Sequence, residues 1–326
     1  MNRVLIIGKR GFIGQNLFKH LKKTNKVSHI SFKKLKIIKK KINDFDYIIN
    51  TSIDKDYIFK KYNSKKDNDL TISKILNDKS KYILLSSRKV YQSKENIKEY
   101  SKLSPKSNYS KNKLITEKKL QKILKKNLII LRISNIIGDR KFIKSIHKTF
   151  IDILFSDIKK GVVTDNKKNF KDFISIEKFC EIIEKILEKK ITGIYNVSIG
   201  KKIYLNDLIS WINKYNRVNI TFKNQPNKLD DCFYLNNQSL ILKPAPIFIS
   251  STVTFTSLLM CSDLVSVLGF CTSARASASD IYSLPVTVLV NVTSVLGVMT
   301  GTLLPLIVSY LTEASVSING IIYPPC

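Results

Sequence analysis

A tyrosine and a lysine one helical turn apart, Tyr109 and Lys113, are the residues of this sequence best suited to moving a proton. They lie at the start of a helical pattern that continues through Leu120. Residues four apart share a face of a helix, so the ammonium of Lys113 can approach the phenol of Tyr109. A nearby positive charge stabilises phenolate, which prepares a tyrosine for acid/base catalysis near neutral pH. Taken alone, the pair also fits a solvated helix face, because lysine is abundant along the chain.

Two serines supply a further polar group. Ser86 and Ser87 follow a short apolar run that begins at Tyr82, and they end a predicted strand. The hydroxyl of Ser87 is suited to hydrogen-bond the same substrate oxygen that Tyr109 would protonate. Ser87, Tyr109 and Lys113 are therefore the candidate catalytic residues.

Three glycines near the N-terminus predict a binding site for a dinucleotide. They follow the run Val4–Ile7, which is apolar on both faces, as is typical of a strand covered by helices on both sides. Gly8 allows a tight turn, Gly11 leaves space for a ligand, and Gly14 lets a helix over Phe12–Leu21 pack closely on the sheet. The backbone N–H groups at the start of that helix suit a pyrophosphate.

The remaining elements that must position these residues follow a regular spacing. Short apolar runs alternate with segments long enough for crossover helices, and the later predicted strands are Val27–Phe32, Tyr47–Thr51, Tyr82–Ser86 and Leu128–Ile133. This pattern predicts an α/β fold, a doubly wound parallel sheet of the Rossmann type with a small C-terminal substrate domain. We assign residues 1–135 to the dinucleotide-binding domain, residues 136–242 to a substrate-binding part whose elements return to the Rossmann domain, and residues 243–326 to an atypical apolar tail.

The end of the second predicted strand bears on the choice between NAD and NADP. NAD recognition normally uses a carboxylate there, which would repel the 2′-phosphate of NADP. No carboxylate lies between Val27 and Ile42, and Ser31, Lys33 and Lys34 stand at the expected position. A hydroxyl followed by lysines suits a phosphate, so the sequence favours NADP over NAD.

Composition excludes several classes of function. The chain of 326 residues has a formal net charge of +31, but its lysines are spread over every segment without a patch interleaved with aromatic residues, so we expect no specific nucleic-acid binding. The five cysteines form no Cys-x-x-Cys pair and there are only three histidines, so we expect neither a metal site nor a disulfide framework. The first apolar run ends in the glycine turn and is too short for a signal peptide, so we expect a cytoplasmic protein.

Taken together, these features resemble the extended short-chain dehydrogenase/reductase family, in particular its NAD-dependent epimerase/dehydratase branch, over about residues 1–240. The three glycines occupy the family's glycine-rich turn. The further matching segments, in chain order, are Asn68 with Thr71, Leu131–Arg140, Lys171–Ile174 and Gly193–Val197. The resemblance implies an enzyme that transfers hydride between a nicotinamide cofactor and a carbon of a nucleotide sugar.

The resemblance also implies roles for single residues. Tyr109 would be the general acid/base, Lys113 would support it and bind the nicotinamide ribose, and Ser87 would orient the reacting oxygen. Asn135 and Arg140 would meet the substrate, together with basic residues around position 171.

The expected cofactor site combines the glycine turn with the adenosine end. In NADP-using reductases of the family an arginine within this turn approaches the adenosine phosphate, and Arg10 stands there in this chain. The expected cofactor-binding residues are Gly8, Arg10, Gly11, Phe12, Ile13, Gly14, Ser31, Lys33, Thr51, Tyr109 and Lys113.

One departure from the family narrows the reaction. Sugar 4,6-dehydratases of the family follow the catalytic hydroxyl with an Asp-Glu pair that handles water elimination, but here Ser87 is followed by Arg88 and Lys89. Dehydration is therefore disfavoured, and we predict a keto-sugar reductase. A nucleotide-sugar 4-epimerase needs the same catalytic residues and stays open, as does a homodimeric state. A non-catalytic NADP-binding scaffold or sensor subunit is the alternative of another class.

Residues 243–326 differ sharply from the rest in composition. Lys243 and Arg275 are their only basic residues, and the run from residue 281 to residue 312 is uncharged and long enough to span a bilayer. Pro285 and Pro305 weaken a helical interpretation of this run. Three hypotheses remain: a foreign or misread terminus, a membrane anchor that would make the membrane a partner through the tail alone, or a β-rich accessory segment.

Overall fold

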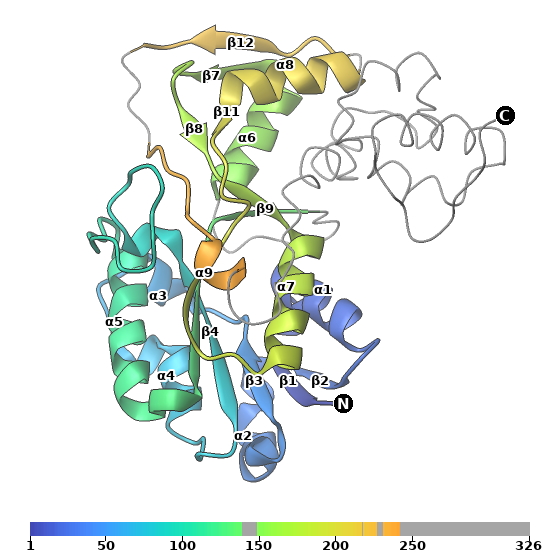
Figure 1. Cartoon of the computed structure of the whole chain (residues 1–326), viewed down its shortest axis with the longest axis vertical. Coiled ribbons are helices and arrows are strands. Elements are labelled where there is room, and N and C mark those ends of the chain that lie inside the picture. Colours follow the sequence, from blue (N-terminus) through green and yellow to red (C-terminus); the bar gives the residue numbers. More distant parts are fainter. Residues whose placement is uncertain (139–148, 217, 227–230, 242–326) are drawn as a thin grey trace, which may run out of the picture. The chain divides into compact units, whose positions relative to one another are not determined.

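The computed structural model describes residues 1–138, 149–216, 218–226 and 231–241. Its centre is a parallel sheet of six strands in the order β10-β5-β4-β3-β1-β2 (Figure 1). These strands are β1 (Arg3–Ile7), β2 (Lys26–Ile30), β3 (Tyr47–Asn50), β4 (Lys81–Ser87), β5 (Leu128–Ile133) and β10 (Gly193–Val197). The predicted doubly wound sheet is confirmed.

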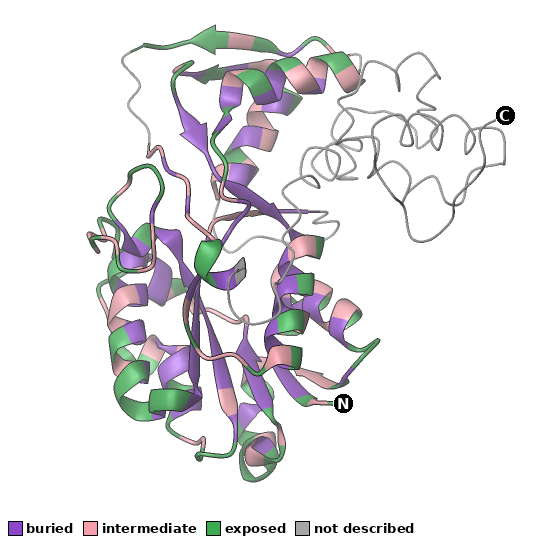
Figure 2. Ribbon diagram, viewed as in Figure 1, coloured by how far each residue is buried: buried purple, intermediate pink, exposed green. Residues whose placement is uncertain are grey.

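Helices cover both faces of this sheet, so its central strands are buried on both sides (Figures 1 and 2). On one face Val4 and Ile6 of β1 pack with α1 (Phe12–Leu21) and α7 (Ile176–Lys189), and α7 alternates buried and exposed residues at helical spacing. The opposite face packs with α2 (Leu35–Ile38), α4 (Asn68–Ser73) and α5 (Asn108–Leu124), and α3 (Lys55–Phe59) contacts α5. Burial of Val4–Ile7 in β1 and of every residue in β3 and β5 explains why these sequences read as largely apolar runs.

Smaller pairs of strands build the part of the chain that is predicted to bind substrate. The strands β6 (Asn135–Ile137) and β9 (Phe173–Ser175) pair in parallel, as do β7 (Val162–Asp165) and β12 (Thr221–Asn224). An antiparallel pair joins β8 (Phe170–Lys171) to β11 (Ile203–Tyr204). The helices of this part are α6 (Phe150–Lys159) and α8 (Leu205–Asn216), and α9 (Gln238–Ile241) returns to contact β10.

The tail assigned to residues 243–326 lies outside the described residues, as does Arg140. Within the described part of the chain, no helix is both long and apolar enough to cross a membrane. The three hypotheses for the tail therefore stay predictions.

Candidate active site

The candidate site is built where four parallel strands end at the same edge of the sheet. The chain leaves β1 at Gly8, β3 at Thr51, β4 at Arg88 and β5 at Ser134. β1 lies between β2 and β3, so the direction of strand succession reverses beside it. Ligands of open α/β sheets bind in the crevice at such a reversal, outside the carboxyl ends of the strands.

Gly8 makes the first turn possible at this edge. Its φ is +124°, and a Cβ added there would lie 2.2 Å from Oγ1 of Thr51. Thr51 closes the turn from the other side, since its hydroxyl donates a hydrogen bond to the carbonyl oxygen of Ile7 at 3.0 Å. Gly14 is equally constrained, because its Cβ would lie 2.5 Å from the carbonyl oxygen of Gly8. Both glycines are therefore required by packing of the protein itself.

Gly11 differs from these two glycines and fits a ligand cradle. It has ordinary extended backbone, and the nearest heavy atom to an added Cβ would be the carbonyl oxygen of Gly8 at 3.6 Å. It also precedes α1 directly, and among the described residues no side chain caps that helix. The backbone N–H groups at the start of such a helix suit an anionic ligand such as a pyrophosphate. This arrangement fits a dinucleotide cofactor.

The expected adenosine end is positively charged and open. Ser31 caps the single turn Phe32–Lys34 by its backbone position, without a hydrogen bond from its side chain to that turn. Arg10 and Lys33 are both exposed. The turn that carries Gly8 lies against the end of β2, because the N–H of Gly8 donates to the carbonyl oxygen of Ile30 at 2.8 Å.

The helix that carries Tyr109 and Lys113 begins at a reciprocal cap. The hydroxyl of Ser107 accepts a hydrogen bond from the N–H of Ser110, and the hydroxyl of Ser110 accepts one from the N–H of Ser107. This cap fixes the start of α5, and it places Tyr109 in the first turn, where its side chain is half-buried.

Lys113 is buried between α5, β4 and α4. Its Nζ donates a hydrogen bond to the carbonyl oxygen of Leu85 at 2.9 Å, two residues before Ser87, and lies 3.6 Å from Oδ2 of Asp69. Burial alone would lower the pKa of this ammonium, but the charges of Asp69, Tyr109 and Asp67 outweigh it and raise the pKa. The structure thus brings Lys113 to the end of the strand that carries Ser87 and within electrostatic range of Tyr109.

Sequence analysis did not find Asp69. Its Oδ1 accepts hydrogen bonds from Nδ2 of Asn50 at 2.8 Å and from the hydroxyl of Tyr82 at 2.7 Å, and only 5% of the residue is exposed. Burial raises the pKa of the Asp69 carboxyl, against the opposing effects of Lys113 and these donors. The sequence feature that could have pointed to Asp69 is the acidic pair Asp67 and Asp69 within a lysine-rich stretch.

Ser87 ends β4 and remains 9% exposed, and its hydroxyl accepts a hydrogen bond from the N–H of Lys89 at 3.2 Å. The next side chain, Arg88, is buried, where it pairs with the carboxylate of Asp231 and stacks on the ring of Phe233 at 3.6 Å. Although burial opposes it, this partner lowers the pKa of Asp231 to about 2. Arg88 therefore connects the end of β4 to the chain near residue 231.

Two of the residues expected to contact the substrate, Asn135 and Lys171, form hydrogen bonds within the protein itself. Nδ2 of Asn135 donates to the carbonyl oxygen of Asp172 at 3.0 Å. Lys171 is buried, and its Nζ donates to the carbonyl oxygen of Asp231 at 2.8 Å. Arg140 lies outside the described residues, so its role stays a prediction.

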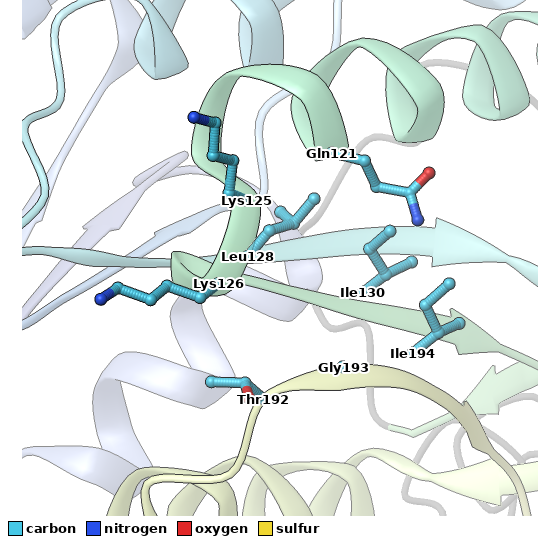
Figure 3. Close-up of a pocket in the computed structure, with 8 residues that line it drawn as sticks. All are labelled: Gln121, Lys125, Lys126, Leu128, Ile130, Thr192, Gly193 and Ile194. Atoms are coloured by element: carbon cyan, nitrogen blue, oxygen red, sulfur yellow. The ribbon is translucent and has the colours of Figure 1, made fainter.

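A hollow of about 190 Å³ lies at the opposite end of the sheet (Figure 3). Its floor includes Leu128 and Gly193, the first residues of β5 and β10, and Gln121 of α5 lies over Ile130 and Ile194. It is therefore separate from the carboxyl edge that carries Ser87.

The comparisons with known proteins agree with this geometry. The model of the NAD dependent epimerase/dehydratase family matches residues 68–198, a stretch that contains Ser87, Tyr109 and Lys113. The predicted family resemblance is confirmed. No curated protein matches the chain by sequence.

Solved structures match over most of the described chain. A UDP-N-acetylglucosamine 4-epimerase from Methanobrevibacter ruminantium is 20% identical with a TM-score of 0.65, covering 82% of this chain and 99% of its own. A dTDP-glucose 4,6-dehydratase from Bacillus anthracis, solved with NAD, is 16% identical with a TM-score of 0.63, covering 82% and 97%. A dTDP-4-dehydrorhamnose reductase from the same organism, solved with NADP, is 14% identical with a TM-score of 0.59, covering 75% and 93%. At these identities the likeness shows the fold.

Proposed function

We propose that this chain, an NAD(P)-dependent enzyme of the epimerase/dehydratase family within the short-chain dehydrogenases/reductases, reduces a keto group of a nucleotide-linked sugar. The observation that carries the proposal is the position of Ser87, Tyr109 and Lys113 at the carboxyl edge of the sheet, beside a glycine turn that fits a dinucleotide. The structural neighbours include an epimerase, a dehydratase and a reductase of nucleotide sugars, which supports the substrate class.

Each candidate residue has a distinct task in such a reduction. Tyr109 would donate its proton to the carbonyl oxygen, and Ser87 would hydrogen-bond that oxygen and hold it in place. The ammonium of Lys113, fixed by the carbonyl oxygen of Leu85, would stabilise the phenolate that remains. When bound, the nicotinamide cofactor would supply the hydride that adds to the carbonyl carbon.

Arg88 supports a reductase over a dehydratase. Sugar 4,6-dehydratases of the family carry an Asp-Glu pair for water elimination after the catalytic hydroxyl, and this chain has Arg88 and Lys89 there. The guanidinium of Arg88 is already engaged by Asp231 and Phe233, so it is not positioned as an acid/base group. A 4-epimerase uses the same three catalytic residues and is distinguished by its product.

The test is to incubate the full chain with nucleotide-linked 4-keto sugars and reduced cofactor, while following nicotinamide absorbance and product mass. A reductase consumes the cofactor, and its product gains the mass of one hydride and one proton. Isomerisation of a nucleotide sugar at unchanged mass without net cofactor consumption would show an epimerase instead. Binding of cofactor without turnover across the sugar panel would favour the scaffold alternative.

Tyr109→Phe is expected to lower turnover by about two to four orders of magnitude, because it removes the proton donor. Cofactor affinity should stay close to that of the unsubstituted chain, which separates loss of chemistry from loss of binding. Tyr100→Phe is the matched control, since Tyr100 is 81% exposed and should tolerate the change. Near-full turnover in the Tyr109→Phe variant would remove Tyr109 from the mechanism.

For the cofactor we propose a preference for NADP over NAD. The proposal rests on the missing carboxylate between residues 27 and 42 and on the exposed cations Arg10 and Lys33. Two charge-assisted bonds to a 2′-phosphate would give a preference of about tenfold or more.

The double variant Arg10→Ala, Lys33→Ala is therefore expected to lose most of that preference in parallel titrations of both cofactors. The control variant Lys118→Ala, Lys122→Ala removes the same charge from exposed positions of α5. Equal affinities for NADP and NAD in the unsubstituted chain, or a preference that survives the first double change, would show that other residues hold the adenosine end.

A further inference from the structure

The contacts of Asp69 form a buried ion-pair site behind the candidate catalytic residues. Oδ2 of Asp69 lies 3.6 Å from Nζ of Lys113, and the side chains are 7% and 8% exposed. Oδ1 is occupied by the donors Asn50 and Tyr82, so the carboxylate is held with one oxygen directed at the ammonium. A carboxylate fixed in this way cannot rotate away from Lys113 without breaking two buried hydrogen bonds.

We propose that Asp69 is a positioning residue that keeps Lys113 charged and in place beneath Tyr109. The inference rests on the proposed role of Tyr109 as proton donor. An ammonium this deeply buried would lose its proton readily without a counter-ion, and a neutral amine stabilises no phenolate. Asp69 thus acts on the chemistry through Lys113 and touches no reacting atom itself.

The other titratable groups around Lys113 do not replace Asp69. Asp67, the N-cap residue of the same helix, has its Oδ2 engaged by the hydroxyls of Tyr62 and Thr116 at 2.8 Å and 2.6 Å. Tyr57 of α3 places its ring 5.7 Å from Nζ of Lys113, and its hydroxyl bonds with Thr116 at 2.7 Å. Asp69 is the carboxylate that forms an ion pair with Lys113 among the described residues.

The Asp69→Asn variant tests this assignment. The amide oxygen of asparagine can still accept hydrogen bonds from Asn50 and Tyr82, while the negative charge is lost. Lys113 should then lose its proton at lower pH and leave the phenolate of Tyr109 without a cation. The ionisation of Tyr109 is read from phenolate absorbance during alkaline titration, as the difference between each variant and the same variant carrying Tyr109→Phe.

The expected result is an upward shift of the Tyr109 titration by about one pH unit or more in Asp69→Asn, with recovery in Asp69→Glu. The control Glu117→Gln removes a buried carboxylate that pairs with Arg132, and it should leave the titration unchanged. An unchanged or downward-shifted titration in Asp69→Asn would overturn the proposal, because Lys113 would then have stayed charged. A Glu variant that behaves like the Asn variant would also overturn it.

This measurement needs no turnover, so it stays decisive even if no nucleotide sugar is converted and the proposed function fails. If Asp69→Asn does not fold, the double variant Asp69→Asn, Lys113→Met decides the matter. A folded double variant would show that an unpaired ammonium was the defect, as proposed. An unfolded one would show that Asp69 acts through its other contacts.

Discussion

At the scale of single residues, burial separates a few informative cations from the many solvated ones. Lys113, Arg88 and Lys171 are each less than a tenth exposed, and each lies against an oxygen of another segment. Burying a cation costs free energy unless it is paired, so these oxygens are needed to keep the three cations buried. The spacing to Tyr109 identified Lys113 in the sequence, whereas the burial of Arg88 and Lys171 is seen only in the structure.

Asp172 should make stability fall as pH rises. Its oxygens accept backbone N–H bonds from Gly200 at 3.3 Å and Leu235 at 2.9 Å, yet burial raises its pKa to about 7 from an ordinary value of 3.8. The folded protein therefore holds a proton that the unfolded chain releases. This contribution to the free energy of unfolding is complete below about pH 4 and is lost as pH rises to about 7.

Urea unfolding of the full chain and of Asp172→Asn at about pH 4 and about pH 8 measures this effect. The wild type should lose up to about 4 kcal/mol of the Asp172 contribution across the interval, and the variant, which cannot titrate at this position, should lack that component. A variant with the same pH dependence as the wild type would contradict the assignment.

At the scale of elements, two glycines of the turn between β1 and α1 differ in role: the fold requires Gly8, whereas Gly11 is expected to leave space for a ligand. Gly8→Ala should destabilise the fold, because its backbone has positive φ and the added methyl would overlap Thr51. Gly11→Ala should cost less than about 1 kcal/mol of unfolding free energy, since its backbone suits alanine.

The informative quantity for Gly11→Ala is cofactor affinity, which we expect to fall about tenfold or more if a pyrophosphate approaches that backbone. Thermal unfolding and cofactor titration of the same samples separate the two effects. Undiminished affinity in the Gly11→Ala variant would place the cofactor elsewhere.

Elements were far more predictable than the contacts between them. The predicted helix Phe12–Leu21 and strand Leu128–Ile133 have the observed bounds, because apolar periodicity and glycine turns act locally. The predicted strand Val27–Phe32 ends earlier, at Ile30, where the chain enters the short turn that begins at Phe32. The pairs Lys113–Asp69 and Arg88–Asp231 could not be predicted, since they join distant segments and depend on which charges become buried.

At the scale of the whole molecule, the six-stranded sheet and the apolar layers on both of its faces are built from described residues that all precede residue 242. Deletion of residues 243–326 is therefore expected to leave a folded chain that binds cofactor as the full chain does. Circular dichroism, cofactor titration and membrane fractionation of both chains make the comparison. If the truncated chain fails to fold, the tail contributes to the core; membrane association of the full chain alone would identify an anchor.

The contacts of β10 imply an order in which parts of the chain fold during synthesis. β10 enters the sheet beside β5, and its buried Asn196 accepts a hydrogen bond from Tyr91 while donating to the carbonyl oxygens of Ile97 and Asn236. The segment that follows Ser87 is thus fastened by residues that the ribosome adds more than a hundred positions later. The glycine turn and its helix can form while the chain is still emerging, but the hydrogen bonds that hold Tyr91 and Ile97 must wait for Asn196 and Asn236. A nascent chain would therefore form the turn proposed to bind the cofactor before it completes the surroundings of the proposed catalytic residues.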